Sequence, residues 1–211
     1  VPDTLLYRVL DAARFAPSGG NRQPWRVIVV KDKERREKLR DAYKLGWREY
    51  SAHVEQGLVP FAPGDDNSWD GPAVDLGAAR EIARPNEFAD NLDSVPVLLV
   101  LCARLAALAV TDNGLGRQSI VGGASVYPFS HNILLAARDE GLGGVMTTVI
   151  CREEDAVRRT LDIPPHYAVA GLLALGHPVR TITKLKRLSV GELATVDSWT
   201  GDRFGARLTA P

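Results

Sequence analysis

The stretch APSGGNRQPWR, residues 16–26, concentrates two glycines, two prolines and two side-chain amides within a short distance. Glycine adopts backbone conformations closed to other residues, and the amides of Asn21 and Gln23 both donate and accept hydrogen bonds. The simplest interpretation of such a stretch is a tight turn covered by Trp25. Whether it also binds a ligand depends on the elements that flank it.

The two cysteines are the candidate nucleophiles of the chain. Cys102 and Cys151 each end an apolar run, VPVLLVLCA and VMTTVIC, which predicts that both lie buried in strands. Their spacing matches neither a metal site nor the disulfide framework of a secreted domain. A nucleophilic thiol needs a base beside it, and the sequence supplies no evident one, so we predict reduced core thiols.

Composition narrows the function classes. The chain has 211 residues, 45% of them hydrophobic, which suits a single domain with a sizeable core. Its 26 basic and 26 acidic side chains cancel, which argues against binding to nucleic acid or to an anionic membrane. No run reaches the roughly 18 apolar residues of a membrane span, and no signal sequence is evident. We therefore expect a cytoplasmic protein that handles a small molecule.

The elements around these residues alternate loosely between helix and strand. The first helix has Asp3 or Thr4 as its predicted cap, and its buried face consists of Leu6, Val9, Leu10 and Ala13. A charged helix follows, capped by Asp32, and another helix is predicted further along the chain. The predicted strands are residues 27–30, 95–103, 145–151 and 166–178, of which 95–103 is central because it is apolar on both faces. The order predicts an α+β or α/β fold with one central sheet.

Two segments are less regular. Residues 45–94 scatter aromatic side chains among Pro, Gly and Asp, which is typical either of a lid over a site or of an unrecognised pair of helices. Residues 118–144 are apolar all round, which indicates a core helix or a subunit contact, and Pro128 should kink this helix or begin its second half. His131 lies in this segment, and we interpret it as a satisfied core residue rather than an acid–base group.

Three segments taken together resemble the FMN-dependent nitroreductase family: APSGGNRQPWRVIVV, HNILLAARDEGLGGVMTT, and VAGLLALGHP followed by KLKRLSVGEL. The resemblance covers most of the chain and is weakest over residues 45–94. It implies a single α+β domain over residues 1–211, with a central mixed sheet flanked by helices, and a homodimer with FMN at the interface. The implied activity is electron transfer from NAD(P)H through FMN to a nitroaromatic, quinone or similar electrophile, by a ping-pong cycle in which the flavin carries the chemistry and no side chain is catalytic.

The resemblance also implies which residues bind the cofactor. The loop would lie against the flavin and ribityl chain, the segment after GLGG would face the N5 and O4 edge, and the basic KLKR segment would bind the phosphate. Ser125 would touch the ring, whereas Trp25 would anchor the loop in the core. The implied cofactor-binding residues are Pro17, Ser18, Gly19, Gly20, Asn21, Gln23, Ser125, Met146, Thr147, Thr148, Lys186 and Arg187.

Two alternatives to this activity stay open, and one of them rests on a departure from the family pattern. The family's Arg-Arg-Ser phosphate motif would precede Val1, so a flavin-sequestering or regulatory protein without turnover is one alternative. The other is a family dehalogenase or enone reductase, in which a lid grips an amino-acid-like substrate. Lys44, Glu49 and Tyr50 are the candidates for that grip.

Overall fold

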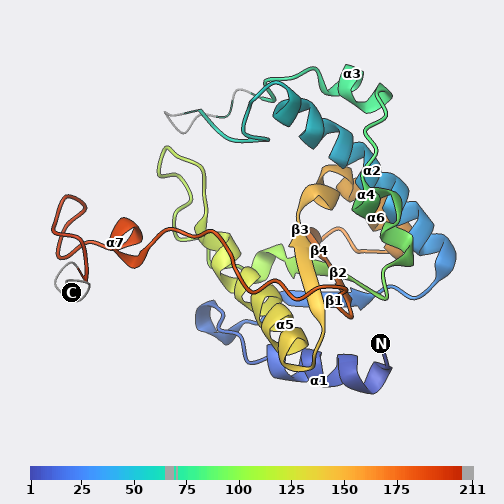
Figure 1. Cartoon of the computed structure of the whole chain (residues 1–211), viewed down its shortest axis with the longest axis horizontal. Coiled ribbons are helices and arrows are strands. Elements are labelled where there is room, and N and C mark those ends of the chain that lie inside the picture. Colours follow the sequence, from blue (N-terminus) through green and yellow to red (C-terminus); the bar gives the residue numbers. More distant parts are fainter. Residues whose placement is uncertain (65–68, 70, 206–211) are drawn as a thin grey trace. The chain divides into compact units, whose positions relative to one another are not determined.

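The computed structural model describes residues 1–64, 69 and 71–205, and the chain divides into two compact units, Val1–Pro178 and Val179–Pro211. The first unit contains a four-stranded sheet (Figure 1). Its strands are β1 (Trp25–Val29), β2 (Val97–Arg104), β3 (Gly143–Thr147) and β4 (Tyr167–Gly176), in the order β1-β2-β4-β3. Every neighbouring pair is antiparallel, so the prediction of a mixed sheet is wrong for the part of the chain described, although the α+β class is confirmed.

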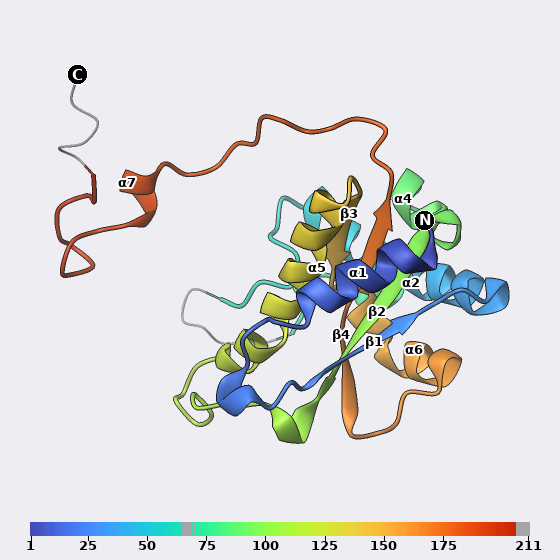
Figure 2. The same ribbon diagram turned by 90° about the horizontal axis from the view of Figure 1, so that it is seen from below.

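Two helical layers cover the sheet (Figures 1 and 2). Helices α1 (Asp3–Ala13) and α5 (Tyr127–Asp139) pack on one face, and α2 (Lys33–Glu55) and α6 (Glu154–Leu161) pack on the other. Strand β2 serves both cores, because Leu99 and Leu101 point into the first and Leu98 and Val100 into the second. This burial on two faces confirms the prediction of a central strand.

The helix starts were predicted with mixed success. The carboxylate of Asp32 accepts a hydrogen bond from the Arg35 amide at 2.9 Å, which confirms it as the cap of α2. The proposed cap of α1 is wrong, because this helix already begins at Asp3 and its N-cap residue is Pro2. The Asp3 carboxylate instead pairs with Lys31.

Helix makes up about half of the segment 45–94 in its described part. Helix α2 continues through to Glu55, and two short helices follow, α3 (Leu76–Glu81) and α4 (Glu87–Asp90). Asp75 and Asn86 cap these two through their side chains. Residues 65–68 and 70 lie outside the described part of the chain. Helical structure was one of the two alternatives that the sequence left open here.

The apolar segment 118–144 is not one continuous helix. A 3₁₀ turn over Val121–Ser125 precedes α5, and Pro128 lies in the first turn of α5, as predicted for a helix start. Trp25 is buried and stacks on Phe129 with 4.9 Å between ring centroids, which confirms it as a core anchor. His131 is exposed, so its interpretation as a core residue is wrong; the inward face of α5 belongs to Ile133 and Ala137.

Both cysteines are free thiols, but only one lies in the sheet. Cys102 is buried in β2, whereas Cys151 lies in the 3₁₀ turn Val149–Glu153, so the strand predicted over 145–151 ends at Thr147. Burial raises the pKa of Cys102 to about 11 and that of Cys151 to about 12. Both thiols are therefore protonated near neutral pH, which argues against either as a nucleophile.

The second unit is small. It contains helix α7 (Val190–Leu193), where the Ser189 amide donates to the Glu192 carboxylate at 2.8 Å, and a β-bridge between Thr195 and Arg203. Trp199 is 95% exposed within this structure. Residues 206–211 lie outside the described part of the chain. No described helix has the length and hydropathy to cross a membrane.

Candidate flavin site

The loop after α1 forms a compact polar turn. Gly19–Asn21 make a single 3₁₀ turn, and the Ser18 hydroxyl accepts a hydrogen bond from the Gln23 amide at 3.0 Å. Gly20, Asn21 and Gln23 have φ values of 60°, 52° and 46°. Two residues that bear side chains are thus held in the left-handed region, a local strain that proteins concentrate at functional sites.

The loop is fixed to the segment that precedes α5. The Gly19 amide donates to the hydroxyl of Ser125, a buried residue, at 3.0 Å. A methyl group at Gly19 would lie 2.9 Å from the Cβ of Ala109. The structure therefore brings together two predicted site residues 106 positions apart, and it explains glycine at position 19 by contact with protein.

Asp112 organises this segment and was missed by the sequence analysis. Its buried carboxylate accepts hydrogen bonds from the Ile120 amide at 2.8 Å and the Ser119 hydroxyl at 2.7 Å, and it pairs with Arg117 at 2.9 Å. These partners, the Ile120 amide foremost, hold the pKa of Asp112 well below its usual range. The only sequence signal was an acidic residue ahead of a glycine-containing turn, DNGLG, which is too common to single out.

The end of β3 points its side chains in alternating directions. Met146 packs against the core that α1 and α5 cover, and the Thr147 hydroxyl lies 3.3 Å from the Tyr43 hydroxyl of α2. Thr148 is exposed, and its hydroxyl has no hydrogen-bond partner among the described residues. The two predicted threonines therefore differ, since the Thr147 hydroxyl contacts α2 and the Thr148 hydroxyl has no partner in the described part of the chain.

The three side chains of the dehalogenase alternative each contact other protein groups. Glu49 is fully buried, and its carboxylate binds Arg80 at 2.5 Å and Arg152 at 2.7 Å. Lys44 pairs with Asp90 at 2.6 Å. Tyr50 stacks on Trp47. In this conformation Glu49 and Lys44 therefore bind protein groups.

The predicted phosphate ligands lie in the second unit. Lys186 and Arg187 are both exposed, and the Arg187 guanidinium donates to the Lys186 carbonyl at 2.8 Å. Neither side chain forms an ion pair with a described residue. Two cations in sequence without acidic partners are suited to an anionic ligand.

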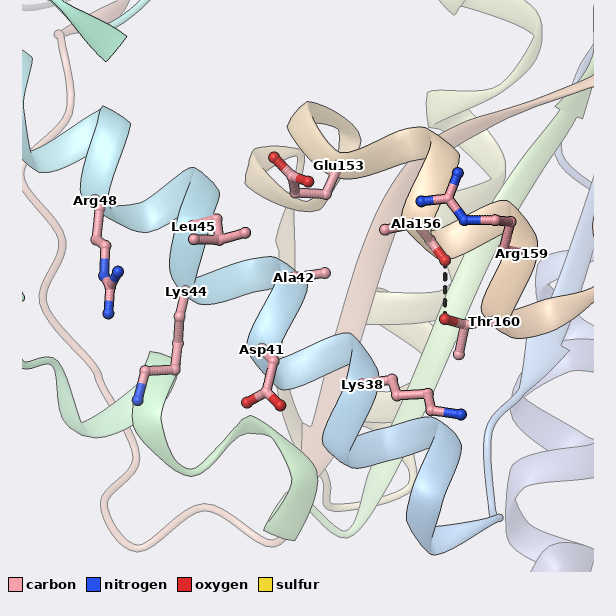
Figure 3. Close-up of a pocket in the computed structure, with 10 residues that line it drawn as sticks. All are labelled: Lys38, Asp41, Ala42, Lys44, Leu45, Arg48, Glu153, Ala156, Arg159 and Thr160. Atoms are coloured by element: carbon pink, nitrogen blue, oxygen red, sulfur yellow. Dashed lines mark hydrogen bonds between the residues drawn. The ribbon is translucent and has the colours of Figure 1, made fainter. Parts of the chain in front are cut away.

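Two hollows are open on the first unit. A cavity of about 470 Å³ lies between the 119–127 segment and the strands β2 and β4, where Ser119 and Tyr127 are its polar side chains. A groove of about 720 Å³ lies between α2 and α6, and Figure 3 shows Ala42, Leu45 and Ala156 facing one another across it. None of the predicted cofactor residues lines either hollow, although the cavity adjoins Ser125 in the chain.

Comparisons with known proteins support the resemblance to the nitroreductase family. The chain matches the model of the Nitroreductase family over residues 1–177. It is 31% identical over 183 residues to an NADH dehydrogenase of Thermus thermophilus, covering 84% of this chain and 78% of that protein. It is 28% identical over 196 residues to iodotyrosine deiodinase 1 of Rattus norvegicus, covering 92% of this chain but only 61% of that protein.

A solved structure supports the same fold. The NADPH:FMN oxidoreductase of Vibrio harveyi, solved in complex with NAD⁺, aligns with a TM-score of 0.64 at 18% identity, over 94% of this chain and 70% of that one. At this identity the likeness establishes the fold alone. The family match spans both helical layers and all four strands described above. The chain is therefore an oxidoreductase of the nitroreductase family.

Proposed function

We propose that the protein binds FMN and passes electrons from NAD(P)H to a small electrophile such as a nitroaromatic or a quinone. The observation that carries this proposal is the family match over residues 1–177. The relatives support it by name, since one is an NADH dehydrogenase and one a NADPH:FMN oxidoreductase. The expected location is cytoplasmic.

The described residues fit such a cofactor chemically. The 17–23 loop exposes the side-chain amides of Asn21 and Gln23, which are hydrogen-bonded to each other at 3.2 Å. Amides of this kind suit the hydroxyls of a ribityl chain. The unpaired cations of Lys186 and Arg187 suit its phosphate, and the open hydroxyl of Thr148 suits an acceptor atom of the ring.

When bound, FMN would supply the redox chemistry, taking two electrons from NAD(P)H and passing them to the electrophile. The reaction therefore requires no nucleophilic side chain. The residues of the chain would bind and orient. Pro17 and Ser18 would place the loop, Gly20 would allow its left-handed turn, and Met146 would place the end of β3 beside the ring. Donors fixed there would stabilise negative charge on the reduced ring.

We further propose that the active form is a homodimer, with α5 and the segment before it in the interface. The support is exposed apolar surface on the elements that flank the candidate site. Tyr7 and Phe15, in and just after α1, are 71% and 72% exposed, and Leu135 of α5 is 55% exposed. Exposed large apolar side chains on elements that pack together, as α1 and α5 do, are typical of a surface that contacts another protein. The apolar side chains of the second unit would find cover in the same assembly.

The purified protein tests the proposal directly. We expect a yellow protein with a flavin absorbance spectrum, from which denaturation releases FMN rather than FAD, and which oxidises NADH or NADPH when a nitroaromatic or quinone is added. A yellow protein without turnover would support the flavin-sequestering alternative instead. A colourless protein that does not take up added FMN would contradict both.

A further inference from the structure

Helix α2 holds the turn that follows β3 at three successive points. Tyr43 contacts Thr147 through their hydroxyls at 3.3 Å. One turn along, a methyl group at Gly46 would lie 2.7 Å from the carbonyl oxygen of Val149. After a further three residues Glu49 binds Arg152 at 2.7 Å. The turn from Thr147 to Arg152 is therefore fixed by one helix, at the place where the proposed flavin edge would lie.

The hydrogen bonds of the Thr147 hydroxyl can be accounted for individually. A hydroxyl accepts two hydrogen bonds and donates one. The Val149 amide donates to this oxygen at 3.3 Å, which occupies one of its two acceptor positions. Tyr43 is 3% exposed, and burial raises its pKa, so its phenol keeps its proton at working pH. A protonated phenol at this distance can fill the second acceptor position.

We propose that Tyr43 is a positioning residue of the flavin site, whose hydroxyl donates to the Thr147 hydroxyl and so leaves that hydroxyl with only its proton to offer to a ligand. The inference rests on the proposed function, because its target is an acceptor atom of bound FMN. The Thr147 hydroxyl can then donate a hydrogen bond to a ligand but cannot accept one from it. A fixed donor favours the more negatively charged, reduced ring and so raises its midpoint potential.

The same helix connects this threonine with the segment that follows α2. Phe88 of α4 packs edge-on against the Tyr43 ring, with centroids 5.7 Å apart. Arg80 of α3 bridges the carboxylates of Glu49 and Glu153. Arg152 lies over the Phe61 ring at 4.9 Å. A movement of the described residues that follow α2 would therefore displace Tyr43 and the turn from Thr147 to Arg152, because these residues contact both directly.

The test uses the FMN-loaded protein and measures the flavin midpoint potential and visible spectrum, together with the melting temperature of the apo-protein. We expect Tyr43→Phe and Thr147→Val to lower the potential, by about 30 mV for each tenfold loss of preference for the reduced flavin. The double variant should lower the potential no further than the stronger single variant, because both substitutions disrupt the same hydrogen bond between Tyr43 and Thr147. Thr147→Ser, which keeps the hydroxyl, should retain the wild-type potential.

Tyr50→Phe is the matched control, since it removes a phenol hydroxyl from the same helix that has no hydrogen-bond partner among the described residues. It should leave the potential unchanged. A wild-type potential in Tyr43→Phe, or additive shifts in the double variant, would overturn the inference. If Tyr43→Phe does not fold, equal potentials in Thr147→Val and Thr147→Ser would overturn it. A wild-type protein that does not bind FMN refutes the proposed function itself, which is a distinguishable result.

Discussion

Single residues in the candidate site are constrained by neighbours far away in the chain. Gly19 is the clearest example, because its amide binds Ser125 and its Cα faces Ala109. The family resemblance identified the glycine, but its reason in the structure is crowding against protein. The adjacent Gly20 is needed for a different reason, since its φ of 60° lies in the left-handed region.

This crowding makes Gly19→Ala destabilising. The added methyl would lie 2.9 Å from the Ala109 Cβ, so the loop or the 105–125 segment has to shift, at a cost of about 1 to 3 kcal/mol in the free energy of unfolding. Ala109→Gly removes the opposing methyl, and the double variant should recover most of that loss. Denaturant unfolding of the three proteins measures this, and a double variant no more stable than Gly19→Ala would contradict the explanation.

At the scale of elements, the segment between β2 and α5 depends on one carboxylate. Asp112 accepts hydrogen bonds from the amides and side chains of the turn, so its pKa in the folded protein is lower than in the unfolded chain. Its contribution to stability is therefore fully present above the unfolded value of about 3.9 and declines as the pH falls below that value.

We therefore expect Asp112→Asn to be less stable than wild type at neutral pH and the gap between the two to narrow as the solution is acidified. Urea unfolding across this range measures the gap. A stability difference that stays constant from neutral pH to below about pH 3 would show that the charge of Asp112 is not what stabilises the segment. The FMN affinity of the variant should fall as well, because the segment carries Ser125.

How far the elements could be predicted depended on whether their stability is local. The apolar run of β2 and the Asp32 cap of α2 are local signals, and both were predicted correctly. The length of α2 was not, because Gly46 normally weakens a helix. In the structure this glycine allows α2 to approach Val149, so tertiary contact outweighs propensity.

The residues of the candidate site could be predicted only where their sequence segments resemble those of a known family. That resemblance gave the loop, Ser125 and the end of β3, and the structure joins the first two by a hydrogen bond. Tyr43, Asp112 and Glu49 have no local signal for their roles, because their partners are separated from them by intervening elements or by turns of no distinctive pattern. Periodicity and capping rules do not report such pairs.

At the scale of the whole molecule, the proposed homodimer predicts that α5 tolerates charge poorly. Leu135→Glu places a carboxylate on its exposed face and should shift the protein to a monomer in sedimentation velocity, with loss of bound FMN. Ile82→Glu is the matched control, since Ile82 is 54% exposed and Leu135 is 55% exposed. A Leu135→Glu protein that stays dimeric would place the interface elsewhere.

The phosphate assignment belongs to the same scale, because its residues lie in the second unit. Arg187→Ala should weaken FMN binding by about 1 to 3 kcal/mol, the usual cost of losing a charge-assisted contact. Lys184→Ala removes a neighbouring exposed cation and should have a much smaller effect. Fluorescence titration of the apo-proteins with FMN compares the two, and equal losses would mean that only the general positive charge of the segment matters.

The reaction rates of the two protonated thiols, Cys102 and Cys151, measure how often the structure around each of them opens. Cys102 lies in the central strand, and Cys151 lies in the turn that α2 holds. With pKa values of about 11 and 12, both thiols should react slowly with an alkylating reagent, and any opening that exposes either thiol should speed its reaction. Mass-resolved labelling rates at the two positions would therefore time the opening of the turn separately from that of the sheet, without any introduced probe.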